Sequence, residues 1–367
     1  GMALLVLGLG RHYFDWPAGV ELGVLGSLLL LSIVIPGLYG NALLHAEAVA
    51  FYRGLEARLA GTRAARLPTL SLEASLSRLG SGASNGDHFG ASVDLSDDGQ
   101  TLAVGATQLG KLFADPARDG KAFVFQDQGS GWVEQAALHD DNLLSGNAFG
   151  QAVALSADGS TLAVGDPRDK APGTGVHPAP LTTSESRNLG AVHLFSPTGG
   201  VWVRTAYVKA PRDIGSAHFG YSVDLDADAR TLLIGAPQAD LDPSGALEDS
   251  VYSNSGAALV YTAGPGGWSF ASMLRAPAPV ASDRFGSVVA ISGDGRTITA
   301  GAYLQDDVGV GVGGPGTGVT SSEFGAAYAF MATGGNWGPA VVLKPSDVVG
   351  TSGTWHGRSV ALSGDGR

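Results

Sequence analysis

Asn147-Ala-Phe-Gly-Gln-Ala-Val-Ala-Leu-Ser-Ala-Asp-Gly-Ser-Thr-Leu-Ala-Val-Gly-Asp166 consists of two short apolar-alternating runs joined by an Asp-Gly pair. Val153 and Leu155 would share one face of a first strand, and Leu162 and Val164 one face of a second. The glycine of the Asp-Gly pair supplies the positive φ that a tight reversal needs. This stretch therefore predicts a β-hairpin.

The same hairpin pattern recurs along the chain. Further copies span Phe89–Ala106, Phe219–Ala236 and Phe285–Ala302, and another copy begins at His356 and stops at Arg367, as a segment of a longer protein would. A third apolar run follows each complete hairpin, and these runs begin at Gly120, Gly190, Gly256 and Gly325. A tryptophan then opens a fourth run, at Trp132, Trp202, Trp268 and Trp337. Leu72 precedes the Phe of the first hairpin by 17 residues, as Trp132, Trp202 and Trp268 precede the Phe of the next hairpin. Leu72–Leu79 is therefore predicted to be the outermost strand of a preceding unit.

Each unit thus holds four short strands in roughly 60 to 70 residues, which is typical of a β-propeller blade. A solenoid usually has a shorter period, and a sandwich does not predict a regular four-strand repeat. We therefore expect an all-β fold, a β-propeller of four-stranded blades over residues 72–367. Blades would begin near residues 86, 147, 216 and 282, with a truncated blade from 354 and a partial one at the other end. Ring closure and total blade number stay open.

The composition limits the classes of partner. The chain carries a net charge of −12, contains 56 glycines and has no cysteine. An acidic body argues against nucleic acid as a partner, because phosphate backbones would be repelled. The lack of cysteine leaves both oxidising and reducing compartments open.

The N-terminal part differs from the repeats. The stretch from Leu22 to Tyr39 has no charged residue, so residues 19–41 predict a transmembrane helix. Residues 1–18 form an N-terminal segment before it, and residues 42–71 a juxtamembrane helix and linker after it. The alternative is a secretory signal cleaved after Ala46-Glu47-Ala48.

The two alternatives place the repeats on different sides of a membrane. Four arginines, Arg53, Arg58, Arg63 and Arg66, follow the apolar stretch, whereas Arg11 alone precedes it. The positive-inside rule would then keep the repeats in the cytoplasm. Cleavage after Ala48 would release them on the opposite side.

The repeats carry a recognisable motif. Phe-Gly pairs open the hairpins at Phe89, Phe149, Phe219 and Phe285, and runs such as Val104-Gly105-Ala106 and Ile234-Gly235-Ala236-Pro237 close them. In these residues the chain resembles the FG-GAP repeats of the integrin α-chain propeller and of bacterial-type proteins built of this repeat. The resemblance implies an extracellular or periplasmic surface module that binds protein or glycan ligands at the propeller rim.

Integrin-like repeats often carry a calcium loop in their first hairpin, and the resemblance directs attention to the acids there. Asp224, Asp226 and Asp228 form the one full triplet of alternating acids, although the turn is a residue short and lacks the final aspartate. Asp94, Ser96 and Asp98 form a partial triplet in the first hairpin. The other interpretation is that these acids lie on the solvent side of an alternating strand.

A second acidic cluster lies in the insertion between the second and third strands of the same unit. Asp240, Asp242, Ser244 and Glu248 have the spacing that opens an EF-hand-type loop, but the bidentate glutamate at the twelfth position is missing. Calcium is therefore the one cofactor predicted, with a solvated acidic loop as the alternative.

Enzyme motifs are weak in this chain. Gly82-Ala-Ser84-Asn-Gly86 matches a nucleophile elbow in spelling, but it lies in a linker with no following helix. Gly105 to Lys111 approaches a phosphate loop, yet Leu112 stands where magnesium needs Ser or Thr. We predict no catalytic residue, and expect a membrane-anchored, non-enzymatic adhesion or ligand-binding module. The alternative is a substrate-docking propeller of an enzyme whose catalytic domain lies outside this segment.

Overall fold

The computed structural model describes residues 88–107, 120–141, 148–242, 244–247, 251–306, 311–313, 323–346 and 353–366. These residues contain strands and no helix, so the fold is all-β over the part described. Within them no helix is long and apolar enough to cross a bilayer. The predicted transmembrane helix at 19–41, the helix and linker at 42–71 and the strand Leu72–Leu79 lie outside the described residues.

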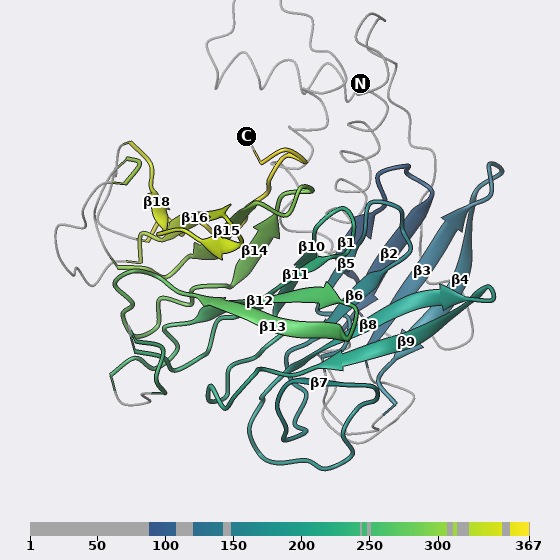
Figure 1. The fold of residues 1–367 in the computed structure, drawn as a ribbon, viewed down its shortest axis with the longest axis horizontal. Coiled ribbons are helices and arrows are strands. Elements are labelled where there is room, and N and C mark those ends of the chain that lie inside the picture. Colours follow the sequence, from purple (N-terminus) through teal and green to yellow (C-terminus); the bar gives the residue numbers. More distant parts are fainter. Residues whose placement is uncertain are drawn as a thin grey trace, which may run out of the picture.

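The strands form four antiparallel sheets, which follow one another along the chain (Figure 1). Sheet A contains β1 (Phe89–Leu95), β2 (Thr101–Ala106), β3 (Lys121–Asp127) and β4 (Trp132–His139). Sheet B contains β5 (Ala152–Leu155), β6 (Leu162–Asp166), β7 (Val176–His177), β8 (Ala191–Thr198) and β9 (Val201–Val208). Sheet C contains β10 (Ser222–Leu225), β11 (Thr231–Ala236), β12 (Ala257–Gly264) and β13 (Gly267–Leu274). Sheet D contains β14 (Val288–Ile291), β15 (Thr297–Ala302), β16 (Ala326–Thr333), β17 (Asn336–Trp337) and β18 (Val341–Leu343).

The predicted hairpins are confirmed, and turn chemistry explains them. In β5–β6, Val153 pairs with Val164 and Leu155 with Leu162. Ser156 Oγ accepts the Thr161 N–H at 2.9 Å and donates to Asp158 Oδ1 at 2.6 Å. Gly159 completes the turn at φ 66°. The Ser-x-Asp-Gly sequence therefore closes the hairpin through its own side chains.

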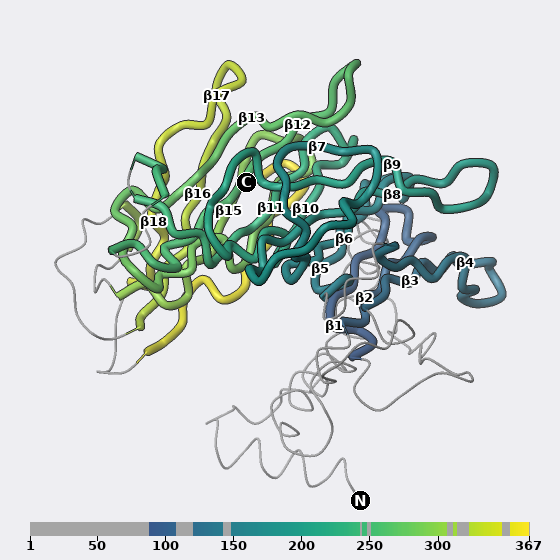
Figure 2. The backbone as a smooth tube through the Cα atoms, turned by 90° about the horizontal axis from the view of Figure 1, so that it is seen from below, coloured from purple at the N-terminus to yellow at the C-terminus, as the bar shows by residue number. Residues whose placement is uncertain are grey.

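The sheets stack in chain order through their first strands. β1 lies beside β5, β5 beside β10, and β10 beside β14. The hairpin turns continue this stacking, because Asp97 donates to the Ala157 carbonyl, Ala157 to Ala227 and Ala227 to Gly293, at 2.9 to 3.0 Å. Figure 2 shows the resulting progression from sheet A, in blue, to sheet D, in yellow-green. Four-stranded units that lean on their neighbours are the arrangement expected of propeller blades.

Hydrophobic cores lie between consecutive sheets. One core contains Val124 of sheet A, Phe149 just before β5, and Val164 on β6 of sheet B. Equivalent cores join sheet B to sheet C and sheet C to sheet D. The fourth-strand tryptophans pack against the cores while remaining partly exposed, at Trp132, Trp202, Trp268 and Trp337. The tryptophans therefore contribute to these cores. Each sheet therefore buries its faces only with the help of the next.

Candidate functional site

The three acids of the predicted calcium triplet serve different partners. Asp224 Oδ2 accepts the Ile291 N–H of sheet D at 2.8 Å. Asp226 Oδ1 accepts the Arg230 N–H at 2.7 Å, inside its own turn. Asp228 is exposed, with Oδ2 3.8 Å from Arg230 Nε. Asp224 therefore bonds to the neighbouring sheet, and Asp226 bonds within its own turn. Calcium binding at this turn stays a prediction.

The interpretation that the first-strand acids face solvent is wrong for Asp94. Its side chain is 5% exposed, and Oδ2 accepts the Leu155 N–H of sheet B at 2.7 Å. Alternation of apolar and polar residues indicates a solvent-exposed face when one side of a sheet is not covered by other parts of the protein. Here the next sheet covers that side, so the polar residue bonds to a neighbouring backbone instead.

The second predicted calcium loop is partly described. Asp240 Oδ1 accepts the Asn254 N–H at 2.7 Å. Asp242 Oδ1 accepts the Ser244 hydroxyl at 2.6 Å and the Ala246 N–H at 2.8 Å, and the Ser244 bond lowers the pKa of Asp242. Glu248 lies outside the described residues. The described members thus close a small acidic loop, and calcium there also stays a prediction.

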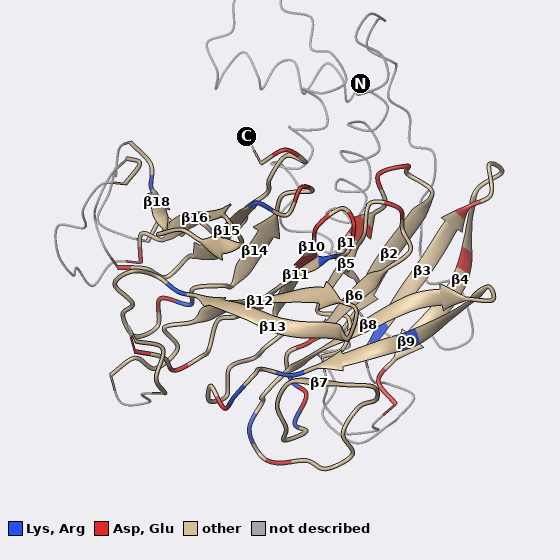
Figure 3. Cartoon of the chain, in the orientation of Figure 1, with Lys and Arg blue, Asp and Glu red and all other residues tan. Residues whose placement is uncertain are grey.

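A cleft of about 330 Å³ lies beside this loop, at the junction of sheets B and C. Arg212, just after β9, and Arg275, just after β13, line it together with Phe270 and Met273 on β13 and Ser244 of the loop. Figure 3 shows that charged residues gather mainly in loops and at strand ends, whereas the strands themselves are largely uncharged. The cleft therefore combines two guanidinium groups with an apolar wall at the rim of the stacked sheets.

Both arginines hold the loop through its backbone. Arg212 Nη2 donates to the Gly245 carbonyl, and Arg275 Nη1 donates to the Asp242 carbonyl at 2.9 Å. Arg275 Nε is buried without a hydrogen-bond partner. Burial lowers the pKa of Arg275, and the nearby charge of Arg212 lowers it further, while Asp242 opposes the shift. The two guanidinium groups thus keep donor capacity beyond the carbonyls that they bind.

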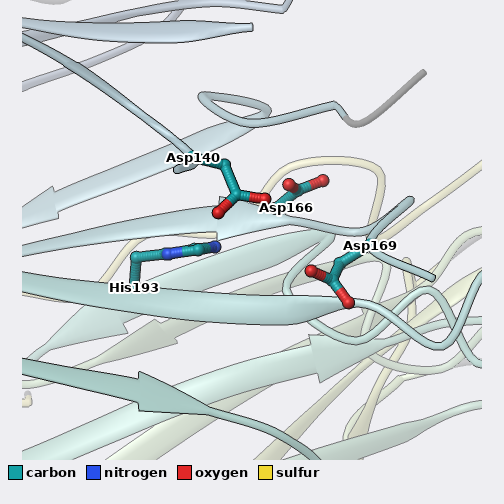
Figure 4. A group of neighbouring side chains, drawn as sticks. All are labelled: Asp140, Asp166, Asp169 and His193. Carbon is teal, nitrogen blue, oxygen red and sulfur yellow. The ribbon is translucent and has the colours of Figure 1, made fainter. Parts of the chain in front are cut away.

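A second group of side chains is fully buried. Asp140, Asp166, Asp169 and His193 are each at most 3% exposed, and one ligand atom of each lies within 4.8 Å of those of the others. Figure 4 shows that the four side chains project into the same space. Within the described ranges this is the one place where three or more such groups come together.

Several polar atoms of this buried cluster have no hydrogen-bond partner. Asp166 Oδ1 accepts the Ala148 N–H at 2.9 Å, but Asp166 Oδ2 has no partner. Neither ring nitrogen of His193 has one. Asp169 Oδ1, in contrast, accepts the Lys209 ammonium at 2.8 Å.

Burial and neighbouring charges shift the pKa values of Asp166 and His193 in the buried cluster. Burial raises the pKa of Asp166 well above its usual range, and the nearby carboxylates of Asp169 and Asp140 raise it further. Burial lowers the pKa of His193 well below its usual range, with Arg204 and Lys209 adding to the shift. Sequence reasoning missed this cluster. Its one visible signal was Asp166, which stands where the other complete hairpins end in alanine.

The chain is similar to several solved structures at low sequence identity. No curated protein matches the chain. Among solved structures, TolB from Acinetobacter baumannii is similar with a TM-score of 0.36 and 8% identity, over 69% of this chain and 43% of that one. The chain therefore spans less than half the length of that protein.

Two further solved structures are similar at the same level. A protein described as TolB from Agrobacterium tumefaciens has a TM-score of 0.36 and 12% identity, over 75% of this chain and 76% of that one. The periplasmic gluconolactonase PpgL of Pseudomonas aeruginosa has a TM-score of 0.34 and 15% identity, over 70% of each chain. The family model for the FG-GAP repeat matches residues 132–177 and 268–330, so the chain contains FG-GAP repeats.

Proposed function

We propose that the chain is a non-enzymatic binding module, in which stacked propeller blades present rim loops to an acidic group on a protein or glycan ligand. One observation carries the proposal: Arg212 and Arg275 meet in the cleft beside the loop of Asp242 and Ser244. Loops held by a rigid β scaffold are the usual place for such recognition.

The chemistry of the cleft fits an acidic ligand. Arginine pairs favour carboxylate, sulfate or phosphate groups, because their planar guanidinium groups donate two parallel hydrogen bonds. Phe270 is 40% exposed and offers a ring on which an apolar or sugar face can pack. A carboxylate-bearing sugar or an acidic side chain beside an apolar one would use both features.

Direct binding of acidic probes tests this proposal. We expect oligogalacturonate or a glutamate-rich peptide to bind the full 367-residue chain by calorimetry, and neutral maltohexaose not to bind. The two acidic probes distinguish a glycan ligand from a protein ligand. Weakening of the binding in salt would follow from its ionic character.

Variants locate the binding. Arg212→Gln and Arg275→Gln should each reduce the affinity by about tenfold or more, since a hydrogen bond to a charged group contributes about 1.5–3 kcal/mol. Arg230→Gln is the matched control, because this exposed arginine lies in the β10–β11 turn, outside the cleft. The proposal would be refuted if neither acidic probe binds, or if all three variants lose affinity equally.

Membrane attachment through residues 19–41 remains part of the proposed function, with the repeats outside the cytoplasm as the family resemblance implies. The arginines after the apolar stretch argue for the reverse orientation. Protease digestion of intact cells separates the two. Repeats cleaved in intact cells are external, and repeats cleaved only after lysis are internal.

Calcium is a further proposed ligand, at the Asp226 turn and the Asp240 loop. Calcium binding to the native state would raise the melting temperature in proportion to the logarithm of its concentration. Asp226→Ala and Asp240→Ala should each remove part of that rise. An unchanged melting temperature of the parent chain in calcium would exclude both loops.

A further inference from the structure

We propose that Asp140, Asp166, Asp169 and His193 bind one divalent transition-metal ion, of the Mn²⁺ to Zn²⁺ class, which joins sheet A to sheet B. Asp140 follows β4 of sheet A, whereas Asp166 ends β6 and His193 lies on β8 of sheet B. The ion would be structural. All four side chains are buried, so no coordination position is open to a substrate.

The internal repeat shows that these four residues are departures from a common pattern. Backbone pairing and hydrogen bonds fix the equivalent positions in the other sheets. Those positions hold Ala106, Ala236 and Ala302 for Asp166; Phe123, Leu259 and Tyr328 for His193; Ala210 and Ala276 for Asp140; Ala239 and Gln305 for Asp169. Three carboxylates and an imidazole thus replace mainly small or apolar core residues at a single junction between sheets.

Such a replacement is unfavourable unless the charge is compensated. Buried carboxylates and unpaired buried ring nitrogens lose their hydration, at a cost of several kcal/mol in an apolar setting. Lys209 compensates Asp169 through the 2.8 Å ion pair. Asp166 Oδ2 is buried without a hydrogen-bond partner, and a divalent cation would supply the charge that balances this carboxylate.

Unpartnered atoms point to a ligand in addition to the charge. Asp166 Oδ2 and both nitrogens of His193 are buried without hydrogen-bond partners. The imidazole is held between rings, with its centroid 5.0 Å from that of Phe149 and 5.1 Å from that of Tyr207. An oxygen and a nitrogen donor are therefore fixed beside one another with no acceptor or donor from the protein to satisfy them.

The donor set selects the class of ion. Calcium and magnesium prefer oxygen ligands alone, whereas an imidazole nitrogen suits manganese, iron, cobalt and zinc. A set of three carboxylates and one imidazole is therefore better matched to a first-row transition metal. This distinguishes the buried cluster from the Asp226 turn and the Asp240 loop, for which only oxygen donors are predicted.

Metal analysis of the full chain is the first test. We expect the purified chain to contain about one equivalent of manganese or zinc by plasma mass spectrometry. Because the cluster is enclosed, the metal-free form is prepared by unfolding in chelator and refolding. Adding Mn²⁺ or Zn²⁺ during refolding should restore one equivalent and raise the melting temperature by a few degrees. Ca²⁺ should not occupy the cluster, so any calcium-dependent rise should be the same in His193→Phe as in the parent chain.

Variants that restore the repeat provide the sharper test. His193→Phe and Asp166→Ala each introduce a residue found at the equivalent position of another sheet. Both should lose the bound equivalent and the metal-dependent rise in melting temperature. Without metal, His193→Phe should be at least as stable as the parent chain, because it removes unpaired buried nitrogens while keeping an aromatic ring. Asp94→Asn, at a buried aspartate outside the cluster, is the control and should retain the metal.

Three results would overturn the proposal. The first is a refolded chain that binds no Mn²⁺ or Zn²⁺, which would leave a closed network of buried ion pairs and protonated carboxyls. The second is undiminished metal content in both His193→Phe and Asp166→Ala, which would place the ion elsewhere. The third is a bound Ca²⁺ equivalent that is lost in His193→Phe and Asp166→Ala, which would contradict the inferred role of the imidazole.

Discussion

Asp94 and Asp224 occupy the same position in sheets A and C, and each bonds to the backbone of the following sheet. Their carboxylates accept the N–H groups of Leu155 and Ile291, at 2.7 and 2.8 Å. In sheet B the equivalent residue is Ala154, which has no such acceptor. Single polar residues therefore join alternate pairs of sheets, in addition to the hydrophobic cores.

Replacing Asp94 tests this junction at the residue scale. Asp94→Ala should lower the free energy of unfolding by about 1–3 kcal/mol, because a buried N–H of Leu155 loses its acceptor. Asp127→Ala should have almost no effect, since Asp127 is exposed and its carboxylate accepts the nearby Gly129 N–H inside the same turn. Urea denaturation measures both. Similar losses in the two variants would show that the junction adds nothing to stability.

His218 is expected to make stability depend on pH. Burial lowers the pKa of His218 from 6.5 to about 4, and the charges of Arg168 and Arg284 contribute. Asn188 Nδ2 lies 3.3 Å from His218 Nε2, where an amide N–H can donate only to an unprotonated nitrogen. The folded state therefore favours neutral histidine. Its contribution is complete above pH 6.5 and is lost as the pH falls toward 4.

The measurement is a comparison of unfolding free energies between pH 7.5 and pH 4.5 for the parent chain and His218→Gln. Glutamine cannot be protonated in this range, so the variant should lose less stability on acidification. Parallel pH profiles would mean that the histidine titrates alike in the folded and unfolded states.

At the scale of the element, glycines set how closely hairpins approach one another. A Cβ at Gly235, the residue before the end of β11, would overlap the carbonyl oxygen of Gly286 in the next repeat. The same relation holds between Gly105 and Gly150 and between Gly165 and Gly220. Glycine is therefore required at these positions, because a side chain there would overlap the backbone of the next repeat.

An alanine scan of two glycines tests this explanation. Gly235→Ala should destabilise the fold by about 1–3 kcal/mol, as overpacking does when backbone must shift. Gly266→Ala, in the exposed β12–β13 turn with no atom within 4 Å of the added Cβ, should change stability little. Thermal unfolding compares the two directly. A tolerated alanine at Gly235 would show that adjacent repeats can separate without cost.

Over the whole molecule, turns that look exposed in sequence are tied together. The Ala157 N–H donates to Ala227 and the Ala227 N–H to Gly293, which links the first hairpins of sheets B, C and D at 3.0 Å. The hydrophobic cores that consecutive sheets share also link neighbouring repeats. Stability is therefore coupled between neighbouring repeats, as in other repeat folds.

Hydrogen exchange can detect this coupling. The amides of Ala157 and Ala227 should exchange as slowly as those of the adjoining strands, because breaking their hydrogen bonds requires neighbouring sheets to separate. The amide of Gly266, in an exposed turn, is the internal reference. Exchange of Ala157 and Ala227 at the rate of Gly266 would contradict the coupling.

Local patterns in the chain predicted much of this fold. Alternating apolar residues and Asp-Gly turns predicted the hairpins, and the glycine- and tryptophan-led runs predicted the third and fourth strands. The arginine cleft was not predicted, because Arg212 and Arg275 become neighbours only when sheets B and C stack. Calcium binding at the Asp226 turn and the Asp240 loop stays a prediction, and the partners of Asp94 and Asp224 depend on the next sheet.

Sequence alone determined which segments are strands and how they repeat, because strand alternation and turn conformation depend on residues close together in the chain. Tertiary structure decided which faces are covered and which distant side chains meet. Asp140 follows β4 of sheet A and His193 lies on β8 of sheet B, yet they lie in one buried cluster. Stacking of the sheets brings them together, and that stacking arises from shared burial of apolar surface between repeats.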